Sequence, residues 1–333
     1  MLFMMQAVLL CLAALGDGGV ALSDGGPGSW TMSTKLGVGG SEREALIADL
    51  MKSGGGVGET ALTREEAVAL LDDPRAQLVY GEKTVSIVAP SMVARHRQEH
   101  VDLMKRFLAP ERIEAGLKFR EEKAEVLGAV EKKTGVDREV IIGILMWESK
   151  LGTITGDYIA FNALASQAFF VDEANAEAAR REPPPKSKKK PTEDELARLE
   201  AAAKKQAARV ESIRSRGRKN LLALIRQCKT RGMDVLTVKG SWAGALGFPQ
   251  FMPASLRWAD DGNGDGKIDL FEMDDAIASV GKYLQQAGFR KSARDAVYNY
   301  NHESAYVEGV LAFADALKCG KTDGGVCAVD GGI

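Results

Sequence analysis

The chain has 333 residues and a formal net charge of −2, with 45% of its residues apolar and 27% charged. This length allows one large domain or two ordinary ones, and the composition is typical of a folded protein. Near-neutrality argues against nucleic acid as the main partner, because phosphate binding requires a surplus of basic residues on one face.

Residues 1–22 have the pattern of an export signal. The segment from Phe3 to Leu15 is almost wholly apolar, too short to span a bilayer comfortably, and is followed by small residues. It departs from the usual pattern because no Lys or Arg precedes Lys35. We expect a signal peptide over 1–22, a protein exported to the periplasm or cell envelope, and a flexible Gly- and Ser-rich linker over 23–58.

Helical patterns dominate the sequence from residue 59 onward. Thr63 and Glu66 have the spacing of a capping box, and apolar residues then recur at helical intervals. The same criteria predict helices over 63–80, 86–108, 111–134, 140–151, 219–230, 274–287 and 304–318. Strand signals are limited to 84–88 and 267–269. The expected fold class is therefore mainly α, with one domain over 59–320.

The last residues, 321–333, are predicted to form a flexible Gly-rich tail. Cys319 and Cys327 could close a small loop there in an oxidising compartment, or remain unpaired thiols. The four cysteines of the chain are too few for a disulfide scaffold, and Cys228 falls in an apolar run typical of a helical core.

A Pro- and Lys-rich segment interrupts the helical pattern within residues 171–219. From Pro183 to Lys219 the chain has twelve Lys or Arg residues against five Asp or Glu. One interpretation is a polybasic arm that associates with an anionic polymer of the cell envelope. The other, which the sequence favours, is a solvated insertion that leads into a long charged helix.

Glu148 stands near the end of a strongly apolar helical segment. It follows Ile141, Ile144 and Leu145 by seven, four and three residues, so it shares their face of the helix. A carboxylate on a buried face is costly unless it is paired or protonated. Desolvation raises the pKa of such a group, as a general acid for a glycosidic oxygen requires. A buried Glu paired with an Arg or Lys would explain the same pattern.

Three segments of the chain resemble one family of enzymes. They are GILMWESKLG at 143–152, GSWAGALGFPQFMP at 240–253 and YNHESAYV at 300–307. In this order they resemble the signature segments of the B-type lytic murein transglycosylases, over residues 95–318 apart from the charged insertion. The resemblance implies an α+β, lysozyme-like fold with a helical catalytic core.

The resemblance also implies a chemistry. In the family, one glutamic acid at the position of Glu148 protonates the leaving oxygen of the β-1,4 bond between MurNAc and GlcNAc in peptidoglycan. The N-acetyl oxygen of the substrate stabilises the anomeric centre, and the same glutamate then deprotonates the C6 hydroxyl, which closes a 1,6-anhydro ring. The family's substrate-binding residues match Ser241, Gln250, Tyr283, Tyr300, Asn301 and Tyr306. Such side chains suit a neutral polyhydroxyl ligand, although Leu151 and Pro249 depart from the family pattern.

Two other functions remain open on the sequence alone. Ordinary glycosidases use two carboxylates, and the nearest second acids, Asp157 and Glu303, match no residue of the family. A lysozyme-type hydrolase on the same core would use water in place of the C6 hydroxyl. A non-catalytic module would only bind. Peptidoglycan glycan strands are the expected partner in each case, and no oligomeric state is predicted.

Residues 261–272 match the twelve-residue, EF-hand-like calcium loop. The ligand positions fall on Asp261, Asn263, Asp265, Lys267 (through its carbonyl) and Glu272. Gly266 stands at the sharp turn that this loop requires. The family resemblance places the closing acid at Asp275 instead of Glu272, and both alternatives are open. We expect a structural Ca²⁺ ion, the alternative being a metal-free Asp/Gly turn.

Overall fold

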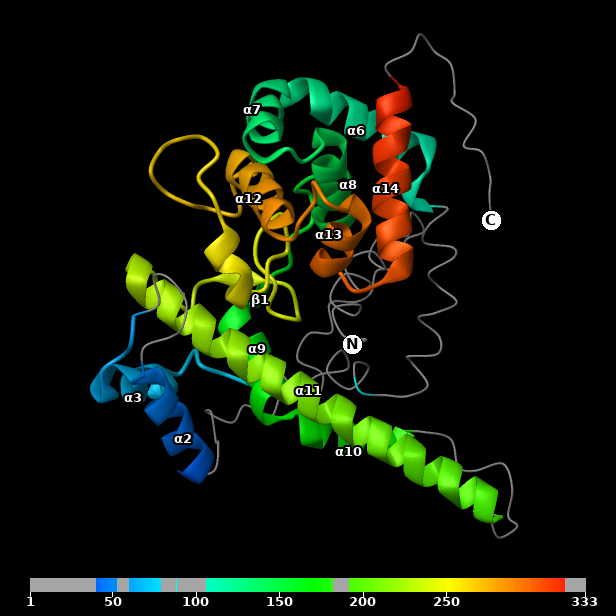
Figure 1. Cartoon of the computed structure of the whole chain (residues 1–333). Coiled ribbons are helices and arrows are strands. Elements are labelled where there is room, and N and C mark those ends of the chain that lie inside the picture. Colours follow the sequence, from blue (N-terminus) through cyan, green and yellow to red (C-terminus); the bar gives the residue numbers. More distant parts are fainter. Residues whose placement is uncertain (1–39, 53–59, 79–87, 89–105, 182–191, 321–333) are drawn as a thin grey trace. The chain divides into compact units, whose positions relative to one another are not determined.

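The computed structural model describes residues 40–52, 60–78, 88, 106–181 and 192–320 (Figure 1). These residues are mainly helical, as the sequence predicts, and the two named strands have two residues each. The chain divides into two compact units, the first with the described residues 106–156 and 245–320 and the second with the others. No helix in the described ranges is both long and apolar enough to cross a membrane.

The first unit is built around α8, because every residue of this helix from Glu139 to Ser149 is buried. Its helices are α6 (Pro110–Glu122), α7 (Ala124–Thr134), α8 (Arg138–Ser149), η1 (Pro253–Trp258, a 3₁₀ helix), α12 (Met273–Gln286), α13 (Ala293–Tyr300) and α14 (Ser304–Cys319). α6, α7, α12 and α14 all pack against α8. A helix that is apolar on all sides needs such enclosure.

Glycines allow α14 to approach its neighbours closely. A Cβ on Gly143 of α8 would lie 3.0 Å from the backbone oxygen of Val310 in α14. A Cβ on Gly116 of α6 would lie 2.9 Å from Leu317 Cδ2 and 3.0 Å from Phe313 Cζ. Larger residues at these two positions would push α14 away from the centre of the unit.

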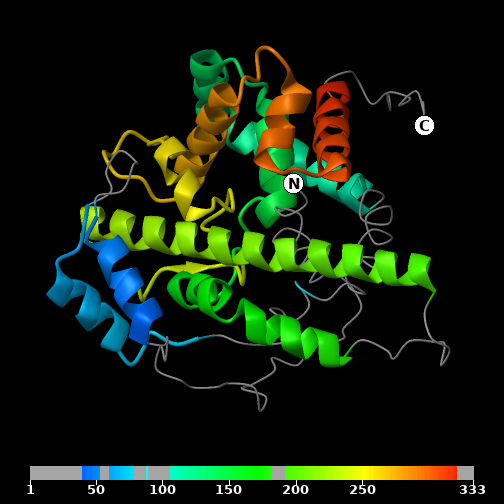
Figure 2. The same ribbon diagram turned by 60° about the horizontal axis from the view of Figure 1, so that its bottom comes forward.

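The second unit is built around the long helix α11. Its elements are α2 (Gly40–Leu50), α3 (Arg64–Asp72), β1 (Tyr158–Ile159), α9 (Ala160–Phe169), α10 (Val171–Arg181), α11 (Glu193–Arg231) and β2 (Lys239–Gly240). β1 and β2 pair antiparallel, with Tyr158 opposite Gly240. Figure 2 shows α11 running alongside α9 and α10, against which it packs. Gly217 permits the contact with α9, since its Cβ would lie 2.9 Å from the Ala168 nitrogen.

Local capping signals fix where several helices begin and end. The capping box predicted at Thr63 and Glu66 is confirmed, because both of its hydrogen bonds are present. Thr192 and Glu195 form a second capping box at the start of α11, and Gly232 ends that helix with a left-handed φ of 65°.

Two sequence predictions are wrong in the first unit. Residues 111–134 form two helices, because Lys123 has a non-helical φ of −110° and its Nζ binds Asp274 Oδ1 at 2.6 Å. No strand covers 267–269, where the Asp269 N–H donates to Asp275 Oδ2 at 2.7 Å within a loop. A side-chain contact decides the local conformation in both places: a long-range one at Lys123 and a local one at Asp269.

The linker predicted over 23–58 is wrong for residues 40–50, which form α2. Leu46, Ile47 and Leu50 of this helix are fully buried. Arg218 of α11 also forms an ion pair with Asp49 at 2.7 Å. The sequence analysis missed this helix because glycines flank it. Its apolar face packs against α11 and α3.

Two helices differ in extent from their predictions. The helix predicted over 63–80 ends at Asp72, because Pro74 cannot continue it. The helix predicted over 219–230 begins at Glu193, because the charged insertion is itself largely helical. The predicted segments 1–22, 84–87, 89–105, 183–191 and 321–333, with Cys327, lie outside the described residues.

We predict that Gly281→Ala destabilises the first unit. Its Cβ would lie 2.3 Å from Cγ1 of the buried Val130, so α7 and α12 must separate. We expect the free energy of unfolding to fall by about 1–3 kcal/mol in urea titrations. Gly128→Ala is the matched control, because its Cβ meets nothing closer than 3.9 Å and a helical Gly→Ala change alone gains up to about 1 kcal/mol. Equal stability of the two variants would contradict the packing argument.

Candidate active site

Glu148 lies in the last turn of α8, with only 3% of its surface exposed. The Tyr306 hydroxyl, on α14, donates a hydrogen bond to Glu148 Oε1 at 2.9 Å. No basic side chain in the described part of the chain acts on this carboxyl group. Within those residues, the alternative of a buried Glu paired with an Arg or Lys is not observed.

Burial raises the pKa of Glu148 to about 8, and the hydrogen bond from Tyr306 opposes part of this rise. An unperturbed glutamic acid titrates near pH ~4.3. At neutral pH the Glu148 carboxyl group is therefore mostly protonated and can donate a proton to a substrate oxygen. This protonation state is the one that a general acid needs before the reaction begins.

Three tyrosines from three helices form a cluster beside this acid. The tyrosine cluster consists of Tyr283 on α12, Tyr300 on α13 and Tyr306 on α14. The rings of Tyr300 and Tyr306 are parallel, with centroids 6.5 Å apart and 7° between their planes. Tyr283 meets Tyr300 edge-on at 4.8 Å. All three were predicted to bind sugar, and the structure brings them together with Glu148.

The buried rings of the tyrosine cluster have structural tasks of their own. Tyr300 donates its hydroxyl proton to the Pro249 carbonyl at 2.6 Å, and Tyr283 donates to the Asn299 carbonyl at 2.8 Å. Tyr306 is fully buried and Tyr300 nearly so, whereas Tyr283 is half-buried. Of the three rings, Tyr283 offers the most surface to a pyranose.

Gln250 and Asn301 place amide groups in the same unit. Gln250 has a left-handed φ of 51°, and its Nε2 donates to the carbonyls of Gly247 at 2.8 Å and Thr155 at 3.2 Å. Asn301 is 2% exposed, and its Oδ1 accepts no hydrogen bond from any described residue. A buried acceptor without a donor is costly, so this oxygen is suited to receive a ligand hydroxyl.

Ser241 belongs to the second unit, where it is buried.

Two glycines of the segment 240–253, Gly244 and Gly247, allow close packing. A Cβ on Gly244 would lie 2.4 Å from Leu164 Cγ, and one on Gly247 would lie 2.4 Å from Leu270 Cβ. Both glycines also have left-handed φ values, of 82° and 67°. A side chain at either position would therefore collide with its neighbour and strain the backbone.

Glu303 is a second acid with a perturbed pKa, and sequence reasoning gave it no role. It precedes α14 and is half-buried, and burial raises its pKa to about 7. Asp157, the other second acid considered, lies in the second unit with 94% of its side chain exposed.

Side chains of the predicted metal loop hold its backbone through hydrogen bonds. Asp261 accepts the N–H groups of Gly264 at 2.6 Å and Gly266 at 2.8 Å. Asn263 and Asp265 each accept the N–H two residues further on, at 2.9 and 2.8 Å. Gly264 and Gly266 have left-handed φ values of 77° and 80°. The donor set is all oxygen, as Ca²⁺ prefers.

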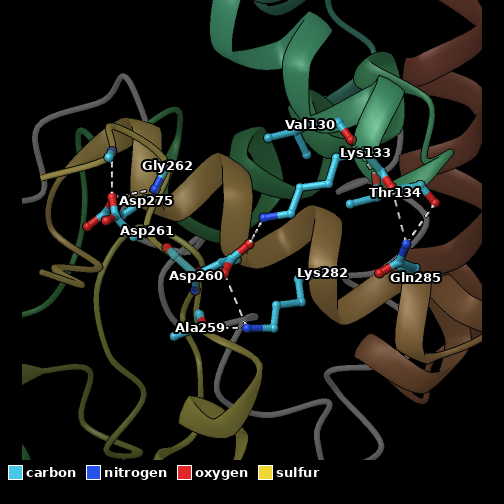
Figure 3. A network of polar contacts seen from close by, with 12 residues as sticks. Val130, Lys133, Thr134, Ala259, Asp260, Asp261, Gly262, Asp275, Lys282 and Gln285 are labelled. Carbon is cyan, nitrogen blue, oxygen red and sulfur yellow. Dashed lines mark hydrogen bonds and ion pairs between the residues drawn. The ribbon is translucent and has the colours of Figure 1, made fainter. Parts of the chain in front are cut away.

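The two candidate closing acids have different surroundings. Glu272 caps α12, because its Oε2 accepts the N–H groups of Asp274 and Asp275. Asp275 is 1% exposed and faces the loop, accepting from Gly262 at 2.8 Å and Asp269 at 2.7 Å (Figure 3). Among the described residues, no group of three or more His, Cys, Asp or Glu side chains is gathered closely enough to hold a metal ion.

Asp260 anchors the start of the loop to two helices. It binds Lys133 of α7 at 2.6 Å and Lys282 of α12 at 3.2 Å (Figure 3). Burial raises the pKa of Asp260, but the hydrogen bonds from the two lysines outweigh this effect and lower it overall. The loop therefore begins at a fixed point whether or not a metal is bound.

The first unit thus holds a buried acid at the end of its central helix, with a raised pKa and a tyrosine hydroxyl as its hydrogen-bond partner. The chain matches the family model of the transglycosylase SLT domain over residues 62–297. This match covers more than half of its length, and the chain belongs to that family. The mainly helical, lysozyme-like fold predicted from the sequence is confirmed by the similar solved structures described below.

The sequence is similar to the membrane-bound lytic murein transglycosylase B of Escherichia coli (strain K12). The two are 28% identical over 194 residues, which are 58% of this chain and 43% of that relative. The chain thus spans less than half the length of the curated relative that it matches.

Solved lytic transglycosylases share the fold. Slt35 of Escherichia coli in complex with bulgecin A has a TM-score of 0.60 and 18% identity, over 84% of this chain and 94% of that chain. The same protein was solved in complex with calcium, with a TM-score of 0.59, 18% identity and the same two coverages. SltB3 of Pseudomonas aeruginosa, in complex with NAG-anhNAM-pentapeptide, has a TM-score of 0.56 and 18% identity, over 84% and 79%.

The raised pKa of Glu148 predicts a pH-dependent stability. Its folded pKa of about 8 lies above the unfolded value near ~4.3. The stability that the protonated acid contributes is therefore fully present below the unfolded pKa. It is lost as the pH rises through the folded pKa. In urea unfolding across this window, we expect wild type to lose up to a few kcal/mol relative to Glu148→Gln, because one pKa unit corresponds to about 1.4 kcal/mol.

Tyr306→Phe provides a second readout of the same group. The variant removes a hydrogen bond that favours the carboxylate, so the loss of stability should move to higher pH. Parallel stability curves for wild type and Glu148→Gln between acid and alkaline pH would show that Glu148 titrates normally.

Proposed function

We propose that the protein is a lytic murein transglycosylase that cleaves the β-1,4 bond between MurNAc and GlcNAc in peptidoglycan, with Glu148 as its only acid/base. The observation that carries the proposal is the buried, protonated carboxyl of Glu148 beside Tyr306. Membership of the transglycosylase SLT domain family supports it. The names of the similar proteins support it as well, since they are lytic transglycosylases.

Glu148 would act twice in this reaction. It first gives its proton to the leaving glycosidic oxygen, so the bond breaks as positive charge develops at the anomeric carbon of MurNAc. The N-acetyl oxygen of that sugar stabilises the anomeric carbon. The carboxylate then takes the proton of the C6 hydroxyl, whose oxygen closes the 1,6-anhydro ring. The acid is regenerated, and no water is consumed.

Tyr306 would assist the second step. Its hydroxyl donates to Glu148 Oε1, so it stabilises the carboxylate that remains after the first proton transfer. It also holds one oxygen, which leaves Oε2 as the oxygen that faces the substrate. The unpartnered Asn301 Oδ1 and the exposed part of Tyr283 would bind sugar. Gln250 and Ser241 are further substrate-binding residues in this proposal.

A lysozyme-type hydrolase is the second candidate, and Glu303 is the observation that favours it. Its pKa of about 7 would suit a general base for water. A two-carboxylate mechanism needs both acids on one glycosidic bond, whereas Glu303 matches no residue of the transglycosylase family. The single-acid mechanism therefore has more support.

Two matched substitutions distinguish these mechanisms. We expect Glu148→Gln to reduce cleavage of purified sacculi by at least about 10³-fold, because no proton donor remains. Glu303→Gln should retain activity within a few-fold of wild type. Mass spectrometry of the released fragments should show 1,6-anhydro ends, which are lighter by one water than reducing ends. Reducing ends together with an inactive Glu303→Gln variant would identify a hydrolase.

We propose an exported protein of the periplasm or cell envelope. The apolar segment before residue 16 supports export, and so does the membrane-bound lytic murein transglycosylase among its relatives. The basic residues around 183–219 would then lie where anionic envelope polymers are available.

We further propose that the loop over 261–275 binds one structural Ca²⁺ ion. Asp261, Asn263 and Asp265 would supply side-chain oxygens and Lys267 its carbonyl oxygen, while Asp275 closes the site. The left-handed glycines and the all-oxygen donor set support the site, and Slt35 was solved with calcium. Asp275 is favoured over Glu272 because its carboxylate faces the loop, whereas that of Glu272 caps α12. A bound ion would neutralise the acidic loop and fix its conformation.

Calorimetry with calcium and with a chelator tests this site. Calcium at 100 times its Kd should stabilise the folded chain by about 3 kcal/mol, seen as a melting temperature several degrees higher. Asp275→Asn should remove most of this calcium-dependent difference. Glu272→Gln should leave it unchanged, although the weaker helix cap lowers both melting temperatures. Identical melting of wild type with calcium and with chelator would exclude the ion.

A further inference from the structure

Arg257 is an exposed cation at the edge of the tyrosine cluster. It lies in η1, which follows the segment that contains Gln250. Its guanidinium carbon is stacked over the ring of Trp258, 5.0 Å from the ring centroid. Stacking orients a planar guanidinium and leaves its in-plane N–H donors available for hydrogen bonds.

The acid nearest to Arg257 in sequence is already engaged. Asp260 binds Lys133 and Lys282, at 2.6 and 3.2 Å. Across the described ranges Arg257 forms no ion pair, and the contact recorded for its side chain is the stacking on Trp258. The guanidinium therefore keeps its capacity to bind a carboxylate with two parallel hydrogen bonds.

Aromatic rings connect this cation to the acid. η1 packs against α12, the helix of Tyr283, and Lys282 of α12 donates to the carbonyl of Ala259, two residues after Arg257, at 3.1 Å. Burial raises the pKa of Tyr283, and the positive charge of Arg257 opposes part of this rise. The Tyr283 ring contacts Tyr300, which stacks on Tyr306, and Tyr306 binds Glu148. Arg257 thus stands at the exposed end of a row of rings whose buried end is the proton donor.

The proposed substrate has anionic groups at one place in each repeat. GlcNAc is neutral, whereas MurNAc has a lactyl branch. In peptide-free strands this branch ends in a carboxylate, and in other strands it is joined to a stem peptide that has carboxylates of its own. A sugar bound at Tyr283 and Glu148 would bring such a branch to the rim of the site.

We propose that Arg257 binds a carboxylate on the lactyl branch of MurNAc and so selects MurNAc-containing strands. This inference rests on the proposed function. It assigns Arg257 a role in substrate recognition and none in proton transfer. Trp258 acts as a positioning residue, because it holds the guanidinium by stacking.

The test compares Arg257→Gln with wild type on three ligands. On peptide-bearing strands and on peptide-free strands, we measure KM and kcat for cleavage. We expect KM to rise about tenfold on at least one of them with kcat within twofold, because a charge-assisted hydrogen bond is lost. The type of strand that responds identifies the source of the carboxylate. In a Glu148→Gln background, the Kd for an uncharged GlcNAc hexamer should not change.

Matched variants separate recognition from a structural effect. Arg257→Lys should raise KM less than Arg257→Gln does. Lysine keeps the positive charge but cannot form two parallel hydrogen bonds with a carboxylate. Trp258→Leu should raise KM less than Arg257→Gln does. Arg290→Gln is the control for loss of one exposed positive charge in the same unit; Arg290 lies against Gly135 at the end of α7, and its substitution should leave KM unchanged.

Two outcomes would overturn the role of Arg257. One is an unchanged KM on both kinds of strand. The other is a loss of affinity for the uncharged hexamer equal to the loss for strands, which would indicate a disturbed site. Either outcome leaves the proposed function intact as long as Glu148→Gln abolishes cleavage by the otherwise wild-type protein. Cleavage that survives in Glu148→Gln would instead overturn the proposed function.

Discussion

The burial of the Glu148 carboxyl is the constraint on which the site depends. α8 is apolar on all sides and enclosed by four helices, so an ionised group at its end would be costly. Among the described residues, Tyr306 donates one hydrogen bond to the carboxyl and no cation offsets its burial. Burial therefore raises the pKa of Glu148 to about 8. The same burial that would destabilise a carboxylate makes the residue a proton donor at neutral pH. Stability and chemistry are therefore opposed at this position, as is common where a function requires a buried polar group.

The hydrogen bond to Glu148 exists only because α14 lies close to α8. Gly143 removes the side chain that would separate these two helices, and Gly116 of α6 does the same between α6 and α14. Tyr306 can then reach the acid from the first turns of α14, and Trp147 packs edge-on against the Tyr306 ring at 5.1 Å. These two glycines thus decide the position of the residue that stabilises the carboxylate.

Some of this site could be predicted from sequence, and the reason is local periodicity. The spacing of Ile141, Ile144 and Leu145 before Glu148 predicted a buried acid, and burial is observed. The hydrogen bond from Tyr306 joins residues 158 positions apart, so no local pattern contains it. The wrong predictions have the same origin. The break at Lys123 and the helix hidden in the expected linker depend on contacts with distant segments, which neither propensity nor composition records.

α12 connects the loop over 261–275 to the residues around the acid. Its first turn carries Asp275, which holds Gly262 and Asp269, and its third turn carries Tyr283. The carbonyl of Leu270, the residue after Asp269, accepts the Phe248 N–H at 2.8 Å. Phe248 is two residues before Gln250, whose left-handed backbone is set by the same tight turn. An ion that orders the loop would consequently act on Gln250 through Leu270 and on the tyrosine cluster through α12, while the Glu148 carboxyl stays fixed by the core.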